Sequence, residues 1–545
     1  MMARRLHTFG YELEQMTVPF VVADKAERNG DKHFLEYLAD GRRFTYREVH
    51  LITNRIANAM RHRGLGSGDH VAVMMDNCPE QFFTYIALAK IGAVSVPLNS
   101  AAKGVLLTYL LAHSDTVMVV LESNYLGRLT EIADTVPAIR GIFVLPDGTD
   151  RADTSGNSWV IEPYDALLTG SEAGPETAPA VGDLAMLAYT SGTTGPSKGN
   201  SLAQGTVISY GCTTAESNGY RDDDTVYVCL PLNHANALLC SVFGAWMANA
   251  AVALSRRFSV SGYWGEVKRS GATVTNVLGS MMNFLWSSPA SPEDRENPLR
   301  VCNVVPMPAF ARDYEQRFGL RLISGYGLTD YCLATVYSTL APTSKLGSSG
   351  TPRSGVEVRI VNEADAEIPT GEVGEIVLRS NNPWGTSQGY YKNAEATLAA
   401  NRNGWWHTGD RGYLDADGYL WFADRKKDAI RRRGENISSF EVETVLLRHP
   451  AIADVAAYPL KAEHAEDEVA VSVVLVEGQQ LSEAELIAFA SANMAYYMVP
   501  RFVRFMADMP RTQNQKVEKY RLRQEAEADT SLMWDREAAG IEVKR

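Results

Sequence analysis

The chain has 545 residues, of which 45% are hydrophobic and 21% are charged, and its formal net charge is −13 at pH 7. The length indicates more than one domain, and the composition is typical of soluble proteins that bury a large core. The negative charge argues against a general nucleic-acid binder, so no nucleic-acid partner is expected.

Cysteine spacing and uncharged segments bear on the compartment. The six cysteines are scattered without any C-x-x-C pair, which favours neither a zinc site nor a disulfide framework, and we therefore expect a reducing cytoplasm. Arg4 and Arg5 are followed by no apolar run, so no secretory signal is expected. Residues 237–254 are uncharged for 18 positions. Their Ala, Ser and Asn content favours a buried helix and strand, and no integral membrane segment is expected.

Helical and strand patterns alternate through the first 125 residues. Thr45 and Glu48 form a capping-box pattern ahead of a helix that continues through Met60. Pro79 is placed for the first turn of a second helix, and residues 104–113 predict a third. Apolar strands are expected at 71–75, 94–98 and 116–121. This alternation predicts βαβ units and a largely parallel sheet.

A loop rich in glycine and hydroxyl residues follows an apolar strand at 184–189. It reads Thr190-Ser191-Gly192-Thr193-Thr194-Gly195-Pro196-Ser197-Lys198-Gly199. Glycines let backbone N–H groups approach an anion, hydroxyls add donors, and Lys198 adds a positive charge. Two residues separate Gly195 from Lys198, so this is not the common P-loop. The pattern alone fits either a phosphate-binding loop or a surface turn.

The composition of the sequence and its pattern of expected helices and strands change twice further along the chain. Residues 147–174 are rich in Gly, Asp, Ser and Thr and predict a surface excursion, before a second α/β block at about 183–337. After residue 344, strands are expected at 356–361 and 375–378 with no long helix, which predicts a smaller β-rich subdomain up to about residue 422. Beyond it, helices are expected at 440–448 and after Ser482, with strands at 454–458, 468–476 and 501–506. This last part predicts a separate α+β domain.

Five motifs in a fixed order resemble the AMP-forming acyl-CoA synthetase and adenylation-enzyme superfamily. Besides the loop at 190–199, they are Tyr326-Gly327-Leu328-Thr329-Asp330, Thr408-Gly409-Asp410, Asp424-Arg425-Lys426-Lys427-Asp428 and Pro510-Arg511-Thr512 through Lys516. The resemblance covers nearly the whole chain. Around residues 231–237 and 430–440 the sequence is similar to the carnitine/crotonobetaine-CoA ligase branch.

The resemblance implies an α/β fold with two mobile parts. A large N-terminal domain of layered α/β subdomains plus a β-rich subdomain would occupy residues 1–423. A hinge would lie at 424–428, with Lys427 at its turning point, and a small mobile α+β C-terminal domain would occupy 429–545. Hinges absorb backbone rotation at a few such positions.

The resemblance also implies an ATP-dependent carboxylic acid:CoA ligase. A carboxylate attacks the α-phosphate of ATP and displaces pyrophosphate, and the thiol of coenzyme A then attacks the acyl-adenylate. The protein has to gather phosphates, neutralise charge and align the attack. The implied cofactors are ATP, Mg²⁺ and coenzyme A, and the implied partner is a small-molecule carboxylic acid.

By the same resemblance, the nucleotide contacts come from several motifs. The phosphates are held by the loop residues Thr190, Ser191, Gly192, Thr193, Thr194 and Lys198, with Thr193 and Asp330 as the metal ligands. Tyr326 and Gly327 lie against adenine, and Thr329 reaches the α-phosphate. Asp410 accepts hydrogen bonds from the ribose hydroxyls, with Arg425 assisting. Asp330 replaces the family's usual Glu and is one methylene shorter, a gap that a water bridge to Mg²⁺ fills.

The C-terminal part supplies a cation and a coenzyme A contact in the same family picture. Lys516 bridges the carboxylate and the α-phosphate as negative charge builds, although Gln515 replaces the Gly that usually precedes it. Lys519 is a neighbouring lysine interpreted as solvated. The basic residues at 425–433 are either a solvated face or a dock for the coenzyme A phosphates. The candidate coenzyme A contacts are Arg433, Gly434 and Glu435.

His234 completes the catalytic candidates, with Thr329 and Lys516. It stands where the family often places an aromatic residue or a histidine beside the acyl carboxylate; the alternative is a satisfied core histidine. The acyl pocket is expected between residues 234–240, 278–282, 303–310 and 326–334, with Asn303 and Ser280 among apolar neighbours. The segment 305–309 lacks the glycines that many members use near adenine.

Two other functions stay open on sequence grounds. One is an adenylating enzyme that passes its acyl group to an amine or a carrier protein, although no carrier domain is apparent after Lys516. The other is a catalytically silent nucleotide-binding protein, which the departures at Asp330 and Gln515 allow.

Overall fold

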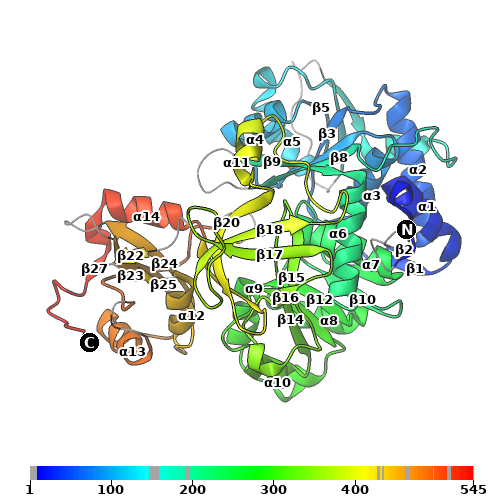
Figure 1. The fold of residues 1–545 in the computed structure, drawn as a ribbon. Helices are drawn as coiled ribbons and strands as arrows, with labels where there is room; N and C mark the ends of the chain where they lie inside the picture. The colour runs from blue at the N-terminus through cyan, green and yellow to red at the C-terminus, as the bar shows by residue number, and fades with distance from the viewer. Residues whose placement is uncertain are drawn as a thin grey trace.

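The structure is a computed structural model that describes residues 9–146, 159–190, 197–425, 430–432, 435–437, 439–461, 467–494, 496, 498–511 and 517–543. In these ranges the fold is built around two large sheets, a β-rich layer and a smaller lobe at the C-terminal end, which stands apart in orange and red in Figure 1. The expected α/β class is confirmed.

The first large sheet has seven strands in the order β7-β6-β5-β3-β4-β8-β9. Its strands are parallel except for the antiparallel pair β8 and β9. Their bounds are β3 (His70–Met74), β4 (Val94–Pro97), β5 (Thr116–Glu122), β6 (Gly141–Leu145), β7 (Val160–Pro163), β8 (Leu184–Thr190) and β9 (Lys198–Ala203). Three helices accompany them, α3 (Pro79–Lys90), α4 (Gly104–His113) and α5 (Leu126–Thr130). This is the predicted alternation, with Pro79 in the first turn of α3.

The second large sheet has nine strands in the order β16-β15-β14-β13-β12-β10-β11-β1-β2. Two N-terminal strands, β1 and β2, join strands that come some two hundred residues later, with Leu35 of β1 beside Val252 of β11. The bounds are β1 (His33–Tyr37), β2 (Arg43–Thr45), β10 (Thr225–Val228), β11 (Ala251–Leu254), β12 (Val274–Leu278), β13 (Val301–Val305), β14 (Arg321–Leu328), β15 (Cys332–Tyr337) and β16 (Thr351–Pro352).

Helices cover the faces of the two sheets and share one core (Figure 1). They are α1 (Val18–Arg28), α2 (Tyr46–His62), α6 (Gln204–Ser217), α7 (Phe243–Ala248), α8 (Tyr263–Ser270), α9 (Gly279–Ser287) and α10 (Ala311–Phe318). The predicted capping box at the start of α2 is present, because Thr45 Oγ1 accepts from the backbone of Glu48 and the Glu48 carboxylate accepts from Thr45. Trp246 is fully buried and packs edge-on against Phe34, with ring centroids 4.4 Å apart.

The uncharged segment at 237–254 is buried, as expected. It forms a π-helical segment, η5 (Asn236–Val242), followed by α7 and β11. Within the described parts of the chain, none of the helices combines the length and the apolar composition that a membrane crossing needs.

The β-rich layer follows and is antiparallel. It consists of β17 (Val356–Val361), β18 (Gly374–Ser380), β19 (Asn401–Arg402), β20 (Trp405–Leu414) and β21 (Leu420–Arg425), with one short helix, α11 (Ala394–Ala400). The predicted strands at 356–361 and 375–378 and the lack of a long helix are both confirmed.

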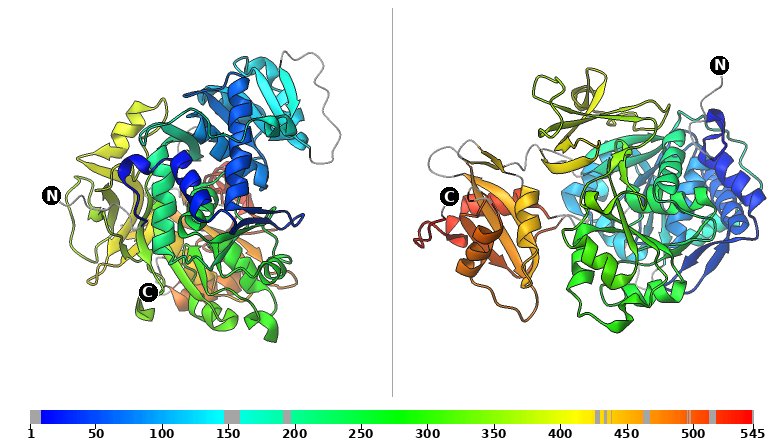
Figure 2. Two further views of the ribbon diagram at one scale, coloured as in Figure 1. Left: turned by 90° about the vertical axis from the view of Figure 1, so that its right-hand side faces the viewer. Right: turned by 60° about the horizontal axis from the view of Figure 1, so that its bottom comes forward.

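The C-terminal lobe has a four-stranded sheet and a hairpin (Figure 2). The sheet contains β24 (Ile452–Lys461), β25 (Asp467–Leu475), β26 (Phe502–Met506) and β27 (Trp534–Asp535), and the hairpin pairs β22 (Ile430–Arg432) with β23 (Glu435–Ile437). Its helices are α12 (Ser439–Leu446), α13 (Glu483–Asn493) and α14 (Lys519–Ala528). Val455, Leu486 and Ile437 belong to a core cluster whose buried members all come from this lobe. The hairpin, α14 and β27 were not predicted.

The expected surface excursion at 147–174 is confirmed for most of its described part, 159–174, whose residues are exposed or partly exposed, but two side chains anchor this part. Residues 147–158 lie outside the described residues, but β7 adds an edge strand to the first sheet and Tyr164 and Leu167 are almost fully buried. Tyr164 donates a hydrogen bond from its hydroxyl to the Glu80 carbonyl. A polar composition concealed two anchors, because only a pair of apolar side chains is needed to hold such a segment on α2.

Two basic residues are also less exposed than predicted. Lys519 was interpreted as solvated, yet its ammonium contacts the Glu443 carboxylate at 2.8 Å and Ser439 Oγ at 2.5 Å. Arg432, from the basic run at 425–433, is 3% exposed and pairs with Glu468 at 2.6 Å. Both side chains form their ion pairs within the C-terminal lobe. Arg432 is therefore neither a solvated residue nor a coenzyme A contact.

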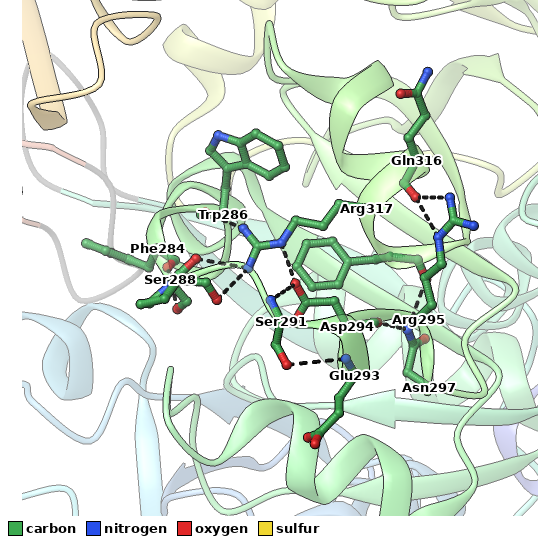
Figure 3. A network of polar contacts seen from close by, with 12 residues as sticks. Phe284, Trp286, Ser288, Ser291, Glu293, Asp294, Arg295, Asn297, Gln316 and Arg317 are labelled. Carbon is green, nitrogen blue, oxygen red and sulfur yellow. Dashed lines mark hydrogen bonds and ion pairs between the residues drawn. The ribbon is translucent and has the colours of Figure 1, made fainter.

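A polar network fixes the end of α9, the helix that follows β12 (Figure 3). The Arg317 guanidinium donates to the Asp294 carboxylate at 2.6 Å and to the carbonyls of Trp286 and Ser288, each at 2.9 Å. On the same helix, the Phe284 ring contacts the Arg511 guanidinium of the C-terminal lobe, 5.9 Å from the ring centroid. Thus α9 is held rigidly on one side and touches the smaller lobe on the other.

Lys90 has a buried ammonium group, and this burial leads us to predict an unusual pH dependence of stability. It is 1% exposed and donates to Asn54 Oδ1 at 2.6 Å and to the His50 carbonyl at 3.0 Å. Burial lowers the pKa of Lys90 to about 7. The unfolded chain keeps this proton up to about pH 10. Between these two values the unfolded state binds more protons, so the Lys90 contribution to stability increases as the pH rises.

We expect the thermal midpoint of the wild-type protein, minus that of Lys90→Met, to increase between about pH 7 and pH 10. Differential scanning calorimetry at several pH values measures this difference. A pH-independent difference would show that Lys90 stays charged in the folded protein. Lys103→Met, in which an exposed lysine is replaced, serves as the control.

Candidate active site

The glycine-rich loop joins β8 and β9 at the edge of the first sheet. Thr190 and Lys198 are paired across the base of the loop, whereas Ser191, Gly192, Thr193 and Thr194 lie outside the described residues. The Tyr109 hydroxyl donates to the Ser197 carbonyl at 2.8 Å, which ties one end of the loop to α4. The described base therefore presents Thr190 and Lys198 on adjacent strands at the entrance to the loop.

The Lys198 ammonium lies 4.7 Å from the centroid of the Tyr390 ring. Tyr390 precedes α11 and its backbone bridges to Asn200 of β9. This residue was not singled out from the sequence, and no spacing signal identifies it, because it comes almost two hundred positions after the loop. A cation held over a ring keeps its charge available to a nearby anion.

Tyr326 and Asp410 form the next part of the site. The Tyr326 hydroxyl donates to Asp410 Oδ2 at 2.7 Å, although the two residues are 84 positions apart, and each is 6% exposed. Phe422 stacks on Tyr326 with ring centroids 6.3 Å apart. The backbone of Arg425 is the direct neighbour of the Asp410 backbone in the register of β20 and β21. Three residues predicted from separate motifs thus meet at one place.

The turn between β14 and β15 carries Gly327, Thr329 and Asp330. A Cβ on Gly327 would lie 2.2 Å from the Cys332 carbonyl oxygen, so only glycine fits there. The Tyr210 hydroxyl donates to the Thr329 carbonyl at 2.8 Å, which fixes the turn on α6. The Thr329 side chain stays partly exposed on the site side of this anchored turn.

Asp330 is a partly exposed residue whose Oδ1 atom is buried and has no hydrogen-bond partner. Burial raises its pKa, opposed by the Tyr390 hydroxyl and by Lys198. A carboxylate oxygen that is buried and unpaired is costly unless a cation or donor binds there. The residue is therefore suited to a hard cation such as Mg²⁺, which prefers oxygen ligands.

His234 lies on the loop that leads from β10 into η5 and is partly exposed. The Asn233 amide approaches its Nε2 atom at 3.3 Å. Asn77, which was not predicted, fixes this loop: its amide donates to the Leu230 carbonyl at 3.0 Å and accepts from the Leu232 N–H at 2.8 Å. A π-helical turn such as η5 is frequent at functional sites.

The predicted coenzyme A and hinge positions are largely beyond the described structure. Lys427, Arg433, Gly434 and Lys516 lie outside the described residues, and Glu435 is described only as the first residue of β23. Phe440 of α12 does reach the site, since its ring meets Phe422 edge-on at 5.9 Å. The C-terminal lobe therefore contacts the aromatic wall beside Tyr326.

Comparisons with known proteins cover both parts of the chain. A family model described as "AMP-binding enzyme" matches residues 22–391, and one described as "AMP-binding enzyme C-terminal domain" matches residues 441–516. A curated relative from Salmonella paratyphi A, named crotonobetaine/carnitine–CoA ligase, is 32% identical over 510 residues, which is 92% of this chain and 97% of the relative. A relative of the same name from Salmonella typhi is 31% identical over 509 residues, again 92% and 97% of the two chains.

Solved structures have the same fold. ATP-bound MatB from Rhodopseudomonas palustris superposes with a TM-score of 0.82 at 26% identity and covers 94% of this chain and 99% of its own. The anthranilate CoA ligase AuaEII in complex with anthranoyl-AMP gives a TM-score of 0.86 at 22% identity and covers 96% and 99% of the two chains.

Proposed function

The chain belongs to the AMP-binding enzyme family and is an AMP-forming acid–CoA ligase, and on this basis we propose which residues carry the reaction and what they bind. ATP and coenzyme A are its co-substrates. Two observations carry the assignment of the site: the Tyr326 hydroxyl bonds Asp410, and the charges of Asp410 and of Lys198, at the base of the glycine-rich loop, both act on the Asp330 carboxyl group.

The nucleotide is held by residues from several motifs, two of which, Tyr326 and Asp410, are in contact. Asp410 accepts hydrogen bonds from the ribose hydroxyls, and Tyr326 fixes its carboxylate and covers the adenine ring. Arg425 and Gly327 complete this side. Lys198 and the loop residues at 190–194 bind the phosphates, and Thr329 donates to the α-phosphate. A carboxylate buried beside a tyrosine hydroxyl is a preorganised acceptor, because its orientation is set before the nucleotide arrives.

Asp330 and Thr193 are the proposed Mg²⁺ ligands. The unpaired Oδ1 atom of Asp330 supports this assignment for the carboxylate. A bound divalent cation supplies charge neutralisation for the phosphates. Asp330 and Thr193 would hold this ion, with Asp330 one methylene shorter than the Glu that the family usually has there.

We expect Asp330→Asn to raise the Mg²⁺ concentration that gives half-maximal activity by about 10-fold or more, since a charged oxygen ligand is lost. Asp330→Glu keeps the charge, so it is expected to keep a magnesium requirement close to that of the wild-type protein. Magnesium titrations of acid-dependent ATP–pyrophosphate exchange measure both effects. An unchanged magnesium requirement in Asp330→Asn would remove this residue from the metal site.

Two half-reactions require two placements of the C-terminal part. Lys516 serves the adenylation step, and Arg433, Gly434 and Glu435 serve the attack by coenzyme A, with Lys427 at the turning point. The parts are residues 1–423 and 429–545, joined at 424–428. The separate core of the C-terminal lobe supports such a division. The contacts of Phe440 and Arg511 with the larger part support one such placement.

The acyl substrate is proposed to be a small polar carboxylic acid, with His234 beside its carboxylate. The names of the curated relatives favour an acid of the carnitine or crotonobetaine type. All six cysteines are free thiols, which suits the cytoplasm as the proposed location.

An acid panel tests the proposed function. The protein is incubated with ATP, Mg²⁺, coenzyme A and each acid, and AMP and the acyl-CoA thioester are measured together. Formation of both with the same acid supports the ligase. AMP and an adenylate without thioester would favour transfer to an amine or carrier, and no acid-dependent AMP at all would favour a silent nucleotide-binding protein.

A further inference from the structure

A chain of buried side-chain hydrogen bonds runs between η5 and β13. Ser241 Oγ donates to the Asn236 carbonyl at 3.0 Å and accepts from the Asn276 amide at 2.7 Å. The Asn276 carbonyl group faces the Asn218 amide at 3.5 Å. The Asn218 carbonyl group in turn accepts from the Asn303 amide at 3.1 Å. All four side chains are more than nine-tenths buried.

The chain has a direction that its first link sets. The Asn236 carbonyl is a backbone group and can only accept, so the Ser241 hydroxyl has to donate to it. Ser241 then has only its oxygen to offer Asn276, which presents its amide nitrogen there and its oxygen to Asn218. In the same way, Asn218 donates from its amide nitrogen to Asn276, so its oxygen is left to accept from the Asn303 amide. The free end is therefore the Asn303 Oδ1 atom, an acceptor, and this atom has no partner.

The residue with the free acceptor, Asn303, begins one of the ranges expected to line the acyl pocket, 303–310. Asn276 and Asn303 are direct neighbours in the parallel register of β12 and β13, and Leu278 and Val305 are the next pair on the same face. Leu278 and Val305 are partly exposed, whereas the asparagines are buried. Two residues of strand separate the pairs, about 7 Å. We call Asn276 and Asn303 the asparagine floor. They lie two strand residues before the partly exposed pair Leu278 and Val305, which is at the carboxyl ends of the strands.

η5 overlaps another range that is expected to line the acyl pocket, residues 234–240. His234, before η5, and Cys240, within it, are partly exposed, and Ser241 is buried. If the carboxylate of the substrate acid lies beside His234, the opposite end of the acid would point toward the asparagine floor. A buried acceptor without a partner is costly, and a ligand that brings a donor removes this cost.

We propose that Asn303 determines substrate specificity by accepting a hydrogen bond from a donor, a hydroxyl or an N–H group, at the far end of a short acyl chain. This inference rests on the proposed ligase function, but it departs from the crotonobetaine-type acid that the names of the curated relatives favour. It favours donor-bearing acids over alkanoic acids, and over quaternary ammonium acids such as crotonobetaine, whose ammonium group carries no N–H.

The test compares matched acids. Terminal-hydroxy acids are paired with alkanoic acids in which a methyl group replaces the hydroxyl, over several short chain lengths, and crotonobetaine is added. ATP–pyrophosphate exchange gives kcat/KM for each acid. We expect the hydroxy acid to exceed its methyl partner by about 10- to 100-fold at the best length. In Asn303→Leu this ratio falls to about 1 or below.

Two controls separate specificity from folding. Asn58→Leu also removes an amide that donates to two carbonyls, but far from the site, and keeps the wild-type ratio. If Asn303→Leu does not fold, Asn303→Ala removes the same acceptor with less bulk, and the ratio is expected to fall in the same way. The KM for ATP stays unchanged in the Asn303 variants, since the floor does not touch the nucleotide residues.

The outcomes distinguish the inference from the function on which it rests. Exchange with equal kcat/KM for both members of every pair, or a clear preference for crotonobetaine, would overturn the role of Asn303 and leave the ligase intact. No exchange with any acid would overturn the ligase assignment and the inference with it.

Discussion

Lys516→Ala is expected to lower kcat for acid-dependent ATP–pyrophosphate exchange by about 10²- to 10³-fold. The proposed lysine stabilises charge that develops between the carboxylate and the α-phosphate, and the loss of one such donor typically costs about 3–4 kcal/mol of transition-state stabilisation. Binding of ATP depends mainly on other residues, so KM for ATP changes little. Because kcat and kcat/KM fall together, the effect belongs to the transition state rather than to substrate binding.

The second half-reaction provides the internal control for Lys516. Thioester formation from a synthetic acyl-adenylate and coenzyme A should proceed at the wild-type rate in Lys516→Ala, since the phosphate chemistry is already complete. Lys461→Ala, at an exposed lysine of the same lobe, should leave both half-reactions unchanged. Equal losses in the two half-reactions of Lys516→Ala would show that the substitution disturbs the lobe rather than the adenylation step.

Asp410→Ala is expected to lower kcat/KM for ATP by about 10²- to 10³-fold, because two hydrogen bonds from the ribose to a charged acceptor are lost. The carboxylate is buried and oriented by the Tyr326 hydroxyl at 2.7 Å. Tyr326→Phe removes only this orienting bond, and we expect a smaller loss of about 10-fold.

Deoxynucleotides identify the role of Asp410 more directly than the rate alone. The wild-type protein should prefer ATP to 2′-deoxy-ATP, and Asp410→Ala should lose this preference, since neither nucleotide then has a ribose acceptor. Asp417→Ala, on the exposed turn between β20 and β21, is the matched control. A variant at Asp410 that still discriminates between the two nucleotides would place the ribose contact elsewhere.

Several parts of the architecture were predictable because their signals are local. The strand before the glycine-rich loop, the capping box at Thr45, the proline at the start of α3 and the β-rich stretch after residue 344 all depend on neighbours within a few positions. Backbone hydrogen bonding and side-chain periodicity act over the same range. The order of the five motifs was enough to indicate the family, which the comparisons confirm.

Other features needed the folded chain, because they depend on contacts between distant segments. Composition predicted a surface excursion at 147–174, yet two of its side chains, Tyr164 and Leu167, are buried beside α2. A run of basic residues suggested a solvated face or a phosphate dock, yet Arg432 is buried with Glu468. In both cases the sequence shows the residue type, and the partner that decides its role comes from another element.

The sequence by itself determined the class of this protein, the order of its elements and the residue types offered to a nucleotide, because these depend on short-range patterns and on motifs read one after another. Only the tertiary structure decided which side chains meet. It places β1 beside β11, Tyr326 against Asp410 and Lys198 over Tyr390, and it leaves single acceptor atoms of Asp330 and Asn303 unpaired. The physical reason is that burial and hydrogen-bond pairing are properties of neighbours in space, which chain order does not specify.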